Sequence, residues 1–260
     1  MMPAATLVKR VSVIILLAYL GFGFLLFFRQ TQLIYYPTAQ DFAACPEFSD
    51  SQKMNSNGTR FYYKNISDKL IVFYHGNAGS ACDRAYLKDI FSGLGYSSIF
   101  VEYAGYAKDA QPPSQTRIMQ DVEHVHNFLK SAGHREIVIV GESLGASLAL
   151  YHSSLADEDQ VLLISPFYSL EDVTRNHYPV YPVSWMLRDK YESNRWLTDL
   201  KKIEVIHGAA DTIVPITGSK KLFNEMAIPQ KKFIEVAGAN HNDMYHFPET
   251  FSAIADFLSR

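Results

Sequence analysis

A serine within the segment Gly-Glu-Ser-Leu-Gly at residues 141–145 has the surroundings of a catalytic nucleophile. The G-x-S-x-G spacing suits a sharp turn between a strand and a helix, because glycines on either side let the two backbones pass. A β-branched apolar run precedes it at residues 137–140, and a helix-compatible run follows at 146–153. Chance gives such a segment in about one chain of this length in ten, but seldom between a buried strand and a helix. We therefore expect Ser143 to attack a carbonyl carbon.

A serine hydroxyl needs a base to take its proton and a carboxylate to orient that base. In a chain with this turn, the carboxylate and then the histidine are expected in loops after later strands. Asp211 follows a predicted strand at 203–206, and His241 follows another at 232–236. Asp211 alone could equally be a helix N-cap, and His246 is an alternative base. Asp211 and His241 both occur in the expected order and in the expected loops, and this joint agreement favours the two.

Two backbone amides are expected to stabilise the oxyanion that forms when Ser143 attacks. One is the amide of Leu144, directly after the nucleophile, and the other comes from the loop after an early strand. That loop follows residues 70–74 and contains Gly76 and Gly79, so Asn77 is the predicted second donor. The same loop lacks the Lys-Ser/Thr ending of a phosphate-binding loop.

The remaining histidines and cysteines predict no metal and no cofactor. His124 and His126 are two residues apart on a predicted helix, so they point to different faces and do not suit metal ligation. Cys45 and Cys82 are too few for a disulfide framework or a metal site, and one bridge between them is left open. A net charge of −3 without a basic stripe excludes a nucleic-acid partner.

The elements that position these residues alternate between strand and helix, which predicts an α/β fold with a mostly parallel sheet. Antiparallel pieces at residues 32–36 and 59–63 are expected at the edge of the sheet, separated by polar segments such as 49–58. Further strands are predicted at 70–74, 97–101, 137–140, 161–164, 203–206 and 232–236, and helices at 80–94, 115–131, 146–153, 217–226 and 249–258.

The insertion at residues 165–200 interrupts this alternation. It contains tyrosines, prolines, Trp185 and Met186 among charged residues, and it is too long for a simple crossover. A packed surface loop is the plain alternative. We favour a short lid over the carboxyl ends of the strands, because its apolar side chains would then flank Ser143.

Residues 11–28 are apolar and uncharged, long enough for about 27 Å of helix and so near the minimum for crossing a bilayer. No cleavage motif follows, and Arg29 comes next, which favours an uncleaved signal anchor. Lys9 and Arg10 outweigh Arg29 and predict a cytoplasmic N-terminus, with the catalytic domain on the exoplasmic or periplasmic side. We expect an anchor at residues 1–30 and one folded domain at 31–260.

Four motifs together resemble the α/β-hydrolase superfamily, over roughly residues 33–260. They are His75-Gly76-Asn77, the segment at 141–145, His207 to Asp211 with Val214-Pro215, and Ala239-Asn240-His241. The short lid, the anchor and residues 32–37 are similar to a small membrane-anchored subgroup that includes protein depalmitoylases. The resemblance implies an eight-stranded sheet with helices on both faces. It also implies Ser143 as nucleophile, His241 as base, Asp211 as its orienter, and Asn77 and Leu144 as oxyanion donors.

The expected activity is hydrolysis of an ester or thioester in an acyl lipid or acylated protein, such as a lysophospholipid or monoacylglycerol. A first alternative is an aminopeptidase on the same fold, which needs an acidic cluster; Glu171, Asp172 and Asp189 are the candidates near the lid. A second is a non-catalytic membrane scaffold. Such proteins usually lack one of the three catalytic side chains, and all three are present here.

Overall fold

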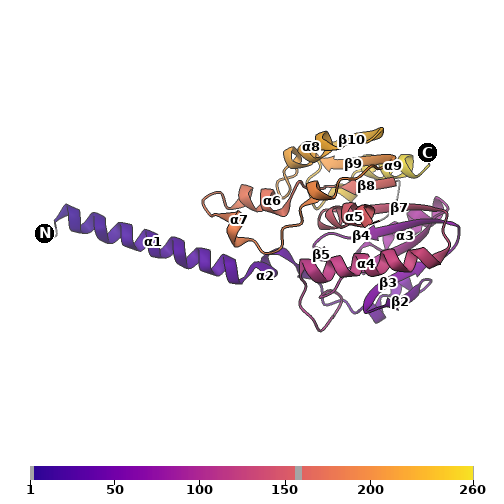
Figure 1. Ribbon diagram of the computed structural model, residues 1–260, viewed down its shortest axis with the longest axis horizontal. Coiled ribbons are helices and arrows are strands. Elements are labelled where there is room, and N and C mark those ends of the chain that lie inside the picture. Colours follow the sequence, from indigo (N-terminus) through magenta and orange to yellow (C-terminus); the bar gives the residue numbers. More distant parts are fainter. Residues whose placement is uncertain (1–2, 156–159, 260) are drawn as a thin grey trace.

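An eight-stranded sheet forms the centre of the computed structural model, which describes residues 3–155 and 160–259 (Figure 1). The outermost residues of the predicted anchor and domain, 1–2 and 260, lie outside that description. The strand order is β10-β9-β8-β7-β4-β6-β3-β2, and all neighbours are parallel except β6–β3 and β3–β2. The strands are β2 (Gln52–Ser56), β3 (Thr59–Lys64), β4 (Lys69–Tyr74), β6 (Ser97–Glu102), β7 (Glu136–Glu142), β8 (Gln160–Ile164), β9 (Lys202–Gly208) and β10 (Gln230–Val236).

Helices cover both faces of this sheet because its central strands are apolar on both sides. In β7, Ile139 belongs to one buried cluster, while Val138 and Val140 belong to the other. The first cluster includes residues of α4 (Gln115–Ala132), α5 (Leu144–Leu155) and α8 (Ile216–Glu225). The second includes residues of α3 (Tyr86–Gly93) and α9 (Pro248–Leu258). The predicted α/β fold with a mostly parallel sheet and helices on both faces is confirmed.

The start of the sheet differs from the prediction. Residues 32–36 do not form a strand of it: α2 (Gln30–Ile34) is a helix, followed by the two-residue β1 (Tyr36–Pro37), which pairs with β5 (Ala78–Gly79). The eighth strand is instead β2, within a stretch interpreted as a polar connection. Because β2 is an edge strand of mostly polar residues, it lacks the alternating pattern that identifies a half-buried strand. The helix predicted at 80–94 is also shorter, with a 3₁₀ turn at Cys82–Arg84 before α3.

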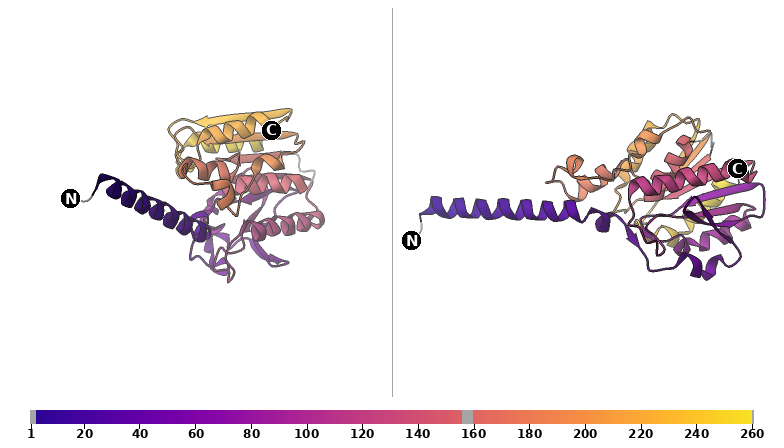
Figure 2. Two further views of the ribbon diagram at one scale, coloured as in Figure 1. Left: turned by 60° about the vertical axis from the view of Figure 1, so that its left-hand side comes forward. Right: turned by 60° about the horizontal axis from the view of Figure 1, so that its bottom comes forward.

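The N-terminal helix α1 (Ala4–Phe28) projects away from the sheet (Figures 1 and 2). It has 25 residues and a mean hydropathy of 2.6 over its most apolar part, so it is long and apolar enough to cross a membrane. Its only buried residue is Gly23. A helix that is apolar on every face and exposed along its length fits a lipid environment.

Residues 165–200 lie between β8 and β9 and extend toward α1 (Figure 2). They form two short helices, α6 (Leu170–His177) and α7 (Val183–Met186), and a 3₁₀ turn at Ser193–Trp196. Because parallel strands end at the same edge of the sheet, this insertion after β8 lies at the edge where Ser143 follows β7. The predicted short lid is therefore present.

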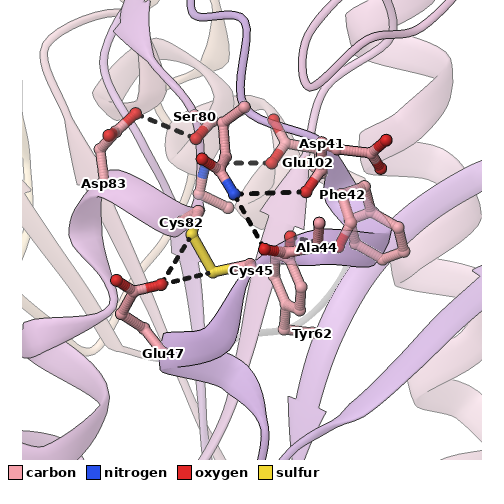
Figure 3. The surroundings of a disulfide bond; sticks show 12 residues. Asp41, Phe42, Ala44, Cys45, Glu47, Tyr62, Ser80, Cys82, Asp83 and Glu102 are labelled. Atoms are coloured by element: carbon pink, nitrogen blue, oxygen red, sulfur yellow. Dashed lines mark hydrogen bonds between the residues drawn. A yellow bond between two sulfur atoms is a disulfide. The ribbon is translucent and has the colours of Figure 1, made fainter.

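A disulfide joins Cys45 to Cys82, answering the question that the sequence left open (Figure 3). It ties the 3₁₀ turns Phe42–Ala44 and Pro46–Phe48, which precede the sheet, to the turn before α3. The residue separation is 37. The bridge therefore fastens the connection between membrane helix and sheet to the loop next to the candidate site.

Candidate active site

Ser143 lies at the sharp turn between β7 and α5. Its φ angle is +53°, a left-handed conformation that non-glycine residues rarely adopt. The amide of Ser143 donates to the carbonyl of Ile164, 2.8 Å away, which holds the turn against β8. A Cβ atom at Gly145 would lie 2.0 Å from the carbonyl oxygen of Tyr74, and one at Gly141 would lie 2.2 Å from that of Gly145. The two glycines are thus required by close backbone contacts.

The structure brings Ser143, His241 and Asp211 together in one hydrogen-bonded chain. The hydroxyl of Ser143 is 2.9 Å from Nε2 of His241, and Nδ1 of His241 is 2.6 Å from Oδ2 of Asp211. With its Nδ1 proton directed at the carboxylate, the imidazole presents Nε2 as an acceptor for the serine proton. The alternative base His246 lies exposed on the 3₁₀ turn Met244–His246.

Asp211 is held by four protein groups. Its Oδ1 accepts from the amides of Ile213 and Val214 at 2.9 and 2.8 Å, and its Oδ2 lies 3.2 Å from Nε2 of His207 in addition to His241. Burial would raise the pKa of this carboxyl, but the bonds from His207 and His241 hold it well below its usual range. Asp211 is therefore ionised at neutral pH.

His207 is a neighbour of the site that the sequence argument left without a role. It is fully buried near the end of β9, and its Nε2 also lies 3.0 Å from the carbonyl oxygen of Val214. It contacts Asp211 because the two are four residues apart across the loop that closes β9. The spacing of His207 and Asp211 was the available signal, but a spacing alone does not reveal how a loop turns.

The two predicted oxyanion donors lie beside Ser143 in the same cavity. Within the described part of the chain, neither the amide of Asn77 nor that of Leu144 has a hydrogen-bond acceptor. The side chain of Asn77 donates to the carbonyl of Ile34 at 2.6 Å, and its carbonyl accepts from the amide of Tyr36 at 3.0 Å. The segment after α1 thus holds the loop that carries one of the two amides.

Glu142, the residue directly before Ser143, forms an ion pair with Arg84. Nε and one terminal nitrogen of Arg84 bond the two carboxylate oxygens of Glu142 at 2.8 and 2.7 Å, and the hydroxyl of Tyr245 adds a third bond at 3.0 Å. Burial would raise the pKa of Glu142, but the bonds from Arg84 and then Tyr245 lower it. The pair connects the loop before α3 to the turn of Ser143. Glu142 lies inside the motif, whereas the sequence carries no signal that selects Arg84.

A cavity of about 640 Å³ opens above Ser143 and His241. Its size suits a drug-sized or larger ligand. Among the described residues that line it, none is Asp, Glu, Lys or Arg, and most are apolar. One wall comes from α1 and α2 and the other from the lid; they include Leu26, Phe27, Leu33, Ile34, Phe167, Val173, Tyr178, Tyr181, Val183 and Met186.

One group of His, Cys, Asp or Glu side chains in the described residues has a spacing that could suit a metal ion: Cys45, Glu47 and Cys82. The two sulfur atoms are bonded to each other, so they cannot act as thiolate ligands (Figure 3). Glu47 Oε2 lies 3.3 Å from each sulfur. This group is a disulfide site and not a metal centre.

Comparison with known proteins finds similar sequences and folds. The chain is 30% identical over 251 residues to an uncharacterised protein of Mycobacterium tuberculosis, covering 90% of this chain and 89% of that protein. It is 27% identical over 221 residues to the lysophosphatidylserine lipase ABHD12 of Xenopus tropicalis, covering 73% of this chain and only 57% of the lipase. No family model matches the sequence.

Solved structures with similar folds include two archaeal enzymes. An esterase of Pyrococcus furiosus superposes with a TM-score of 0.66 at 17% identity, over 81% of this chain and 91% of that one. A monoacylglycerol lipase of Paleococcus ferrophilus superposes with a TM-score of 0.60 at 17% identity, over 77% and 98%. At these identities the likeness establishes a shared fold.

Proposed function

The chain belongs to the α/β-hydrolase family of serine hydrolases, and from that premise we propose that it hydrolyses acyl esters or thioesters. The observation that carries the proposal is the hydrogen-bonded chain from Ser143 through His241 to Asp211 at the floor of an apolar cavity. We further propose that residues 1–30 anchor the chain, and that 31–260 form the hydrolase domain, with its lid at 165–200.

In the proposed reaction, Oγ of Ser143 attacks the carbonyl carbon while Nε2 of His241 takes the hydroxyl proton. Asp211 stays ionised and holds the imidazole tautomer. The amides of Leu144 and Asn77 donate to the oxyanion. The alcohol or thiol leaves with the proton from His241, and a water activated by the same nitrogen then releases the carboxylic acid.

The cavity and its surroundings favour an acyl lipid as the substrate. Its lining lacks Asp, Glu, Lys and Arg among the described residues, so it suits a hydrocarbon chain better than a charged group. Part of its wall belongs to the apolar helix α1. The similarity to a lysophosphatidylserine lipase points in the same direction. A lysophospholipid or a monoacylglycerol is therefore the substrate class to test first.

Neither alternative has comparable support. An aminopeptidase needs acidic groups at the cavity to hold an amino terminus, and the lid acids are engaged elsewhere. Glu171 contacts Arg175 and Ser184, and Asp172 lies 3.9 Å from Nζ of Lys221. Asp189 accepts from the hydroxyl of Tyr35 at 2.7 Å. A scaffold would not need Ser143 to keep a strained turn with a histidine in place.

The experiment uses the full chain in detergent and a fluorophosphonate probe. We expect labelling of the wild type and of Ser147→Ala, because Ser147 pairs with Ser193 and lies away from the cavity, and none of Ser143→Ala. A panel of lysophospholipids, monoacylglycerols and acyl thioesters then identifies the substrate. Absence of labelling in folded wild type would contradict the proposal.

We propose that the catalytic domain faces the exoplasmic or periplasmic side. The Cys45–Cys82 disulfide supports this placement, since disulfides persist mainly in oxidising compartments. A C-terminal epitope tag should then be accessible on intact cells, or on spheroplasts for a periplasmic domain, and an N-terminal tag only after the anchoring membrane is permeabilised. The reverse pattern would refute this orientation.

A further inference from the structure

The tip of the lid, residues 178–187, packs against the C-terminal part of α1 (Figure 2). The rings of Tyr181 and Tyr19 stack with centroids 4.6 Å apart and planes at 1°. The hydroxyl of Tyr19 donates to the carbonyl of Val180 at 2.9 Å, and that of Tyr181 donates to the carbonyl of Tyr19 at 3.1 Å. Beside them, a Cβ at Gly23 would lie 2.9 Å from the ring of Tyr181. Gly23 therefore provides the space for this contact.

The contact lies within the apolar run of the membrane helix. Phe28, where the run ends, is nine positions after Tyr19, which corresponds to about 13 Å along the helix. Half of a bilayer's hydrocarbon core is about 15 Å thick. When α1 crosses a membrane, Tyr181 is therefore below the headgroups of the leaflet nearest the catalytic domain.

The composition of the lid tip suits that depth. The ten residues 178–187 contain no Asp, Glu, Lys or Arg. Trp185 is 90% exposed and Val180 is 70% exposed, although both are large and apolar. The first charge after the tip belongs to Arg188, whose guanidinium lies 4.4 Å from the ring centroid of Phe27, close to the end of α1. A cation level with the end of α1 suits the headgroup region of the bilayer. An exposed tryptophan on the membrane side of that cation suits lipid.

The backbone of the tip also meets the requirement of a lipid environment, where each unpaired amide is costly. Pro179 and Pro182 have no amide hydrogen to satisfy. The amide of Tyr181 donates to the carbonyl of Tyr178, that of Val183 to Tyr181, and that of Leu187 to Val183. The tip thus pairs these groups internally without needing water.

We propose that the lid tip enters the hydrocarbon of one leaflet alongside α1, and that the substrate reaches Ser143 sideways from that leaflet. This rests on the proposed function for the identity of the substrate. The cavity wall supports it: Leu26 and Phe27 of α1 and Tyr181 and Met186 of the lid tip line the same space. The acyl chains of the bilayer, the same ones that surround α1, therefore cover the outer surface of the lid tip.

Depth-dependent quenching tests the insertion directly, because the chain has only two tryptophans, Trp185 and Trp196. The full-length Trp196→Phe variant, with Trp185 as its only emitter, is reconstituted in phosphatidylcholine vesicles containing lipids brominated along the acyl chain. The control is Trp185→Phe, which keeps Trp196; that ring packs on Tyr151 of α5, 5.2 Å between centroids. We expect quenching of Trp185 at least threefold stronger than that of Trp196. Quenching of Trp185 by aqueous iodide but not by bromolipid would overturn the proposal.

Two glycines of α1 provide a matched pair that tests the route. A Cβ at Gly23 already collides with the ring of Tyr181, so Gly23→Leu should displace that ring, whereas a Cβ at Gly21 meets nothing within 4 Å. For a monoacylglycerol embedded in vesicles, we expect Gly23→Leu to reduce the rate at least fivefold relative to Gly21→Leu. Hydrolysis of a soluble short-chain ester should stay equal in the two variants. Equal rates for the embedded substrate would refute lateral entry.

The outcomes separate this inference from the proposed function. Fluorophosphonate labelling of Ser143 without bromolipid quenching of Trp185 would refute the insertion and leave the hydrolase proposal intact. Quenching without labelling would refute the hydrolase proposal while leaving the lid tip in the leaflet.

Discussion

At the scale of single residues, the environment of Asp211 explains why a buried carboxylate can orient His241. Two amides, from Ile213 and Val214, occupy one oxygen, and two histidines lie at the other. These donors hold the pKa of Asp211 down against the effect of burial. The carboxylate is thus available as a fixed acceptor for Nδ1 of His241.

Asp211→Asn should keep the fold but remove the acceptor that selects the His241 tautomer. We expect kcat on a soluble ester to fall about 10⁴-fold, with near-unchanged KM. Steady-state kinetics measures this, and circular dichroism provides the control for folding. A loss of less than tenfold would assign orientation of His241 to another group.

At the scale of elements, the site depends on how closely β7 and α5 approach their neighbours. Gly145 lets α5 contact the end of β4, and the Arg84–Glu142 pair fastens the loop before α3 to the same turn. The helix that follows the turn, α5, is itself mostly buried, and its buried residues include His152. The position of Ser143 is thus set by backbone packing and not by its own side chain.

Gly145→Ala should unfold or strongly destabilise the chain. The added methyl would lie 2.0 Å from the carbonyl oxygen of Tyr74, and backbone cannot move aside there without disrupting β4. We expect a loss of more than about 3 kcal/mol in unfolding free energy, measured by urea denaturation in detergent. Gly93→Ala is the control, because a Cβ there meets nothing within 4 Å. Equal stability of the two variants would contradict this packing argument.

His152 should make the fold weaker in mild acid. Burial, with a smaller effect of His126, lowers its pKa from 6.5 to about 3, and the hydroxyl of Tyr74 lies 2.7 Å from its Nδ1. Since the unfolded chain binds a proton below pH 6.5 and the folded chain does not, this stability is present above pH 6.5 and declines as the pH falls toward 3. Between pH 7 and 5 the loss is about 2 kcal/mol.

The His152→Gln variant isolates that contribution, because glutamine does not titrate. Urea unfolding of wild type and variant at pH 7 and 5 should show a shallower pH dependence for the variant. Parallel pH dependences would show that His152 is not buried in its neutral form.

At the scale of the whole molecule, the segment between α1 and the sheet links the apolar N-terminal helix to the candidate active site. Tyr36 and the carbonyl of Ile34 hold the loop of Asn77, and the disulfide fastens the following turns to Cys82. The walls of the cavity come from α1 with α2 and from the lid. The apolar N-terminal helix is thus part of the candidate site.

Removal of the bridge should weaken that link. In the double variant Cys45→Ala/Cys82→Ala, a separation of 37 residues is no longer closed in the unfolded chain, which corresponds to about 3–4 kcal/mol by the chain-entropy account. Urea unfolding of the full chain in detergent measures this loss of unfolding free energy. Fluorophosphonate labelling of the double variant without urea should persist. An unchanged unfolding midpoint would show that the bridge does not stabilise the fold.

Much of this organisation follows from local sequence patterns. Buried strands such as β4 and β7 are runs of branched apolar residues, and the order of Ser143, Asp211 and His241 in successive loops can be recognised without coordinates. The apolar run of α1 is likewise evident. The strand β2 escapes prediction because a polar edge strand has no such pattern. The strand predicted at 32–36 is wrong, because five residues after an apolar helix fit helix and strand alike.

Contacts between distant residues required the tertiary structure. The sequence by itself determined the α/β class, the candidate residues for acyl transfer and the apolar N-terminal helix, since these depend on residue type and spacing along the chain. The Arg84–Glu142 pair, the second histidine at Asp211, the disulfide and the stacking of Tyr19 on Tyr181 join residues up to 162 positions apart. Such pairs depend on how the chain turns between them, and no local pattern encodes that geometry.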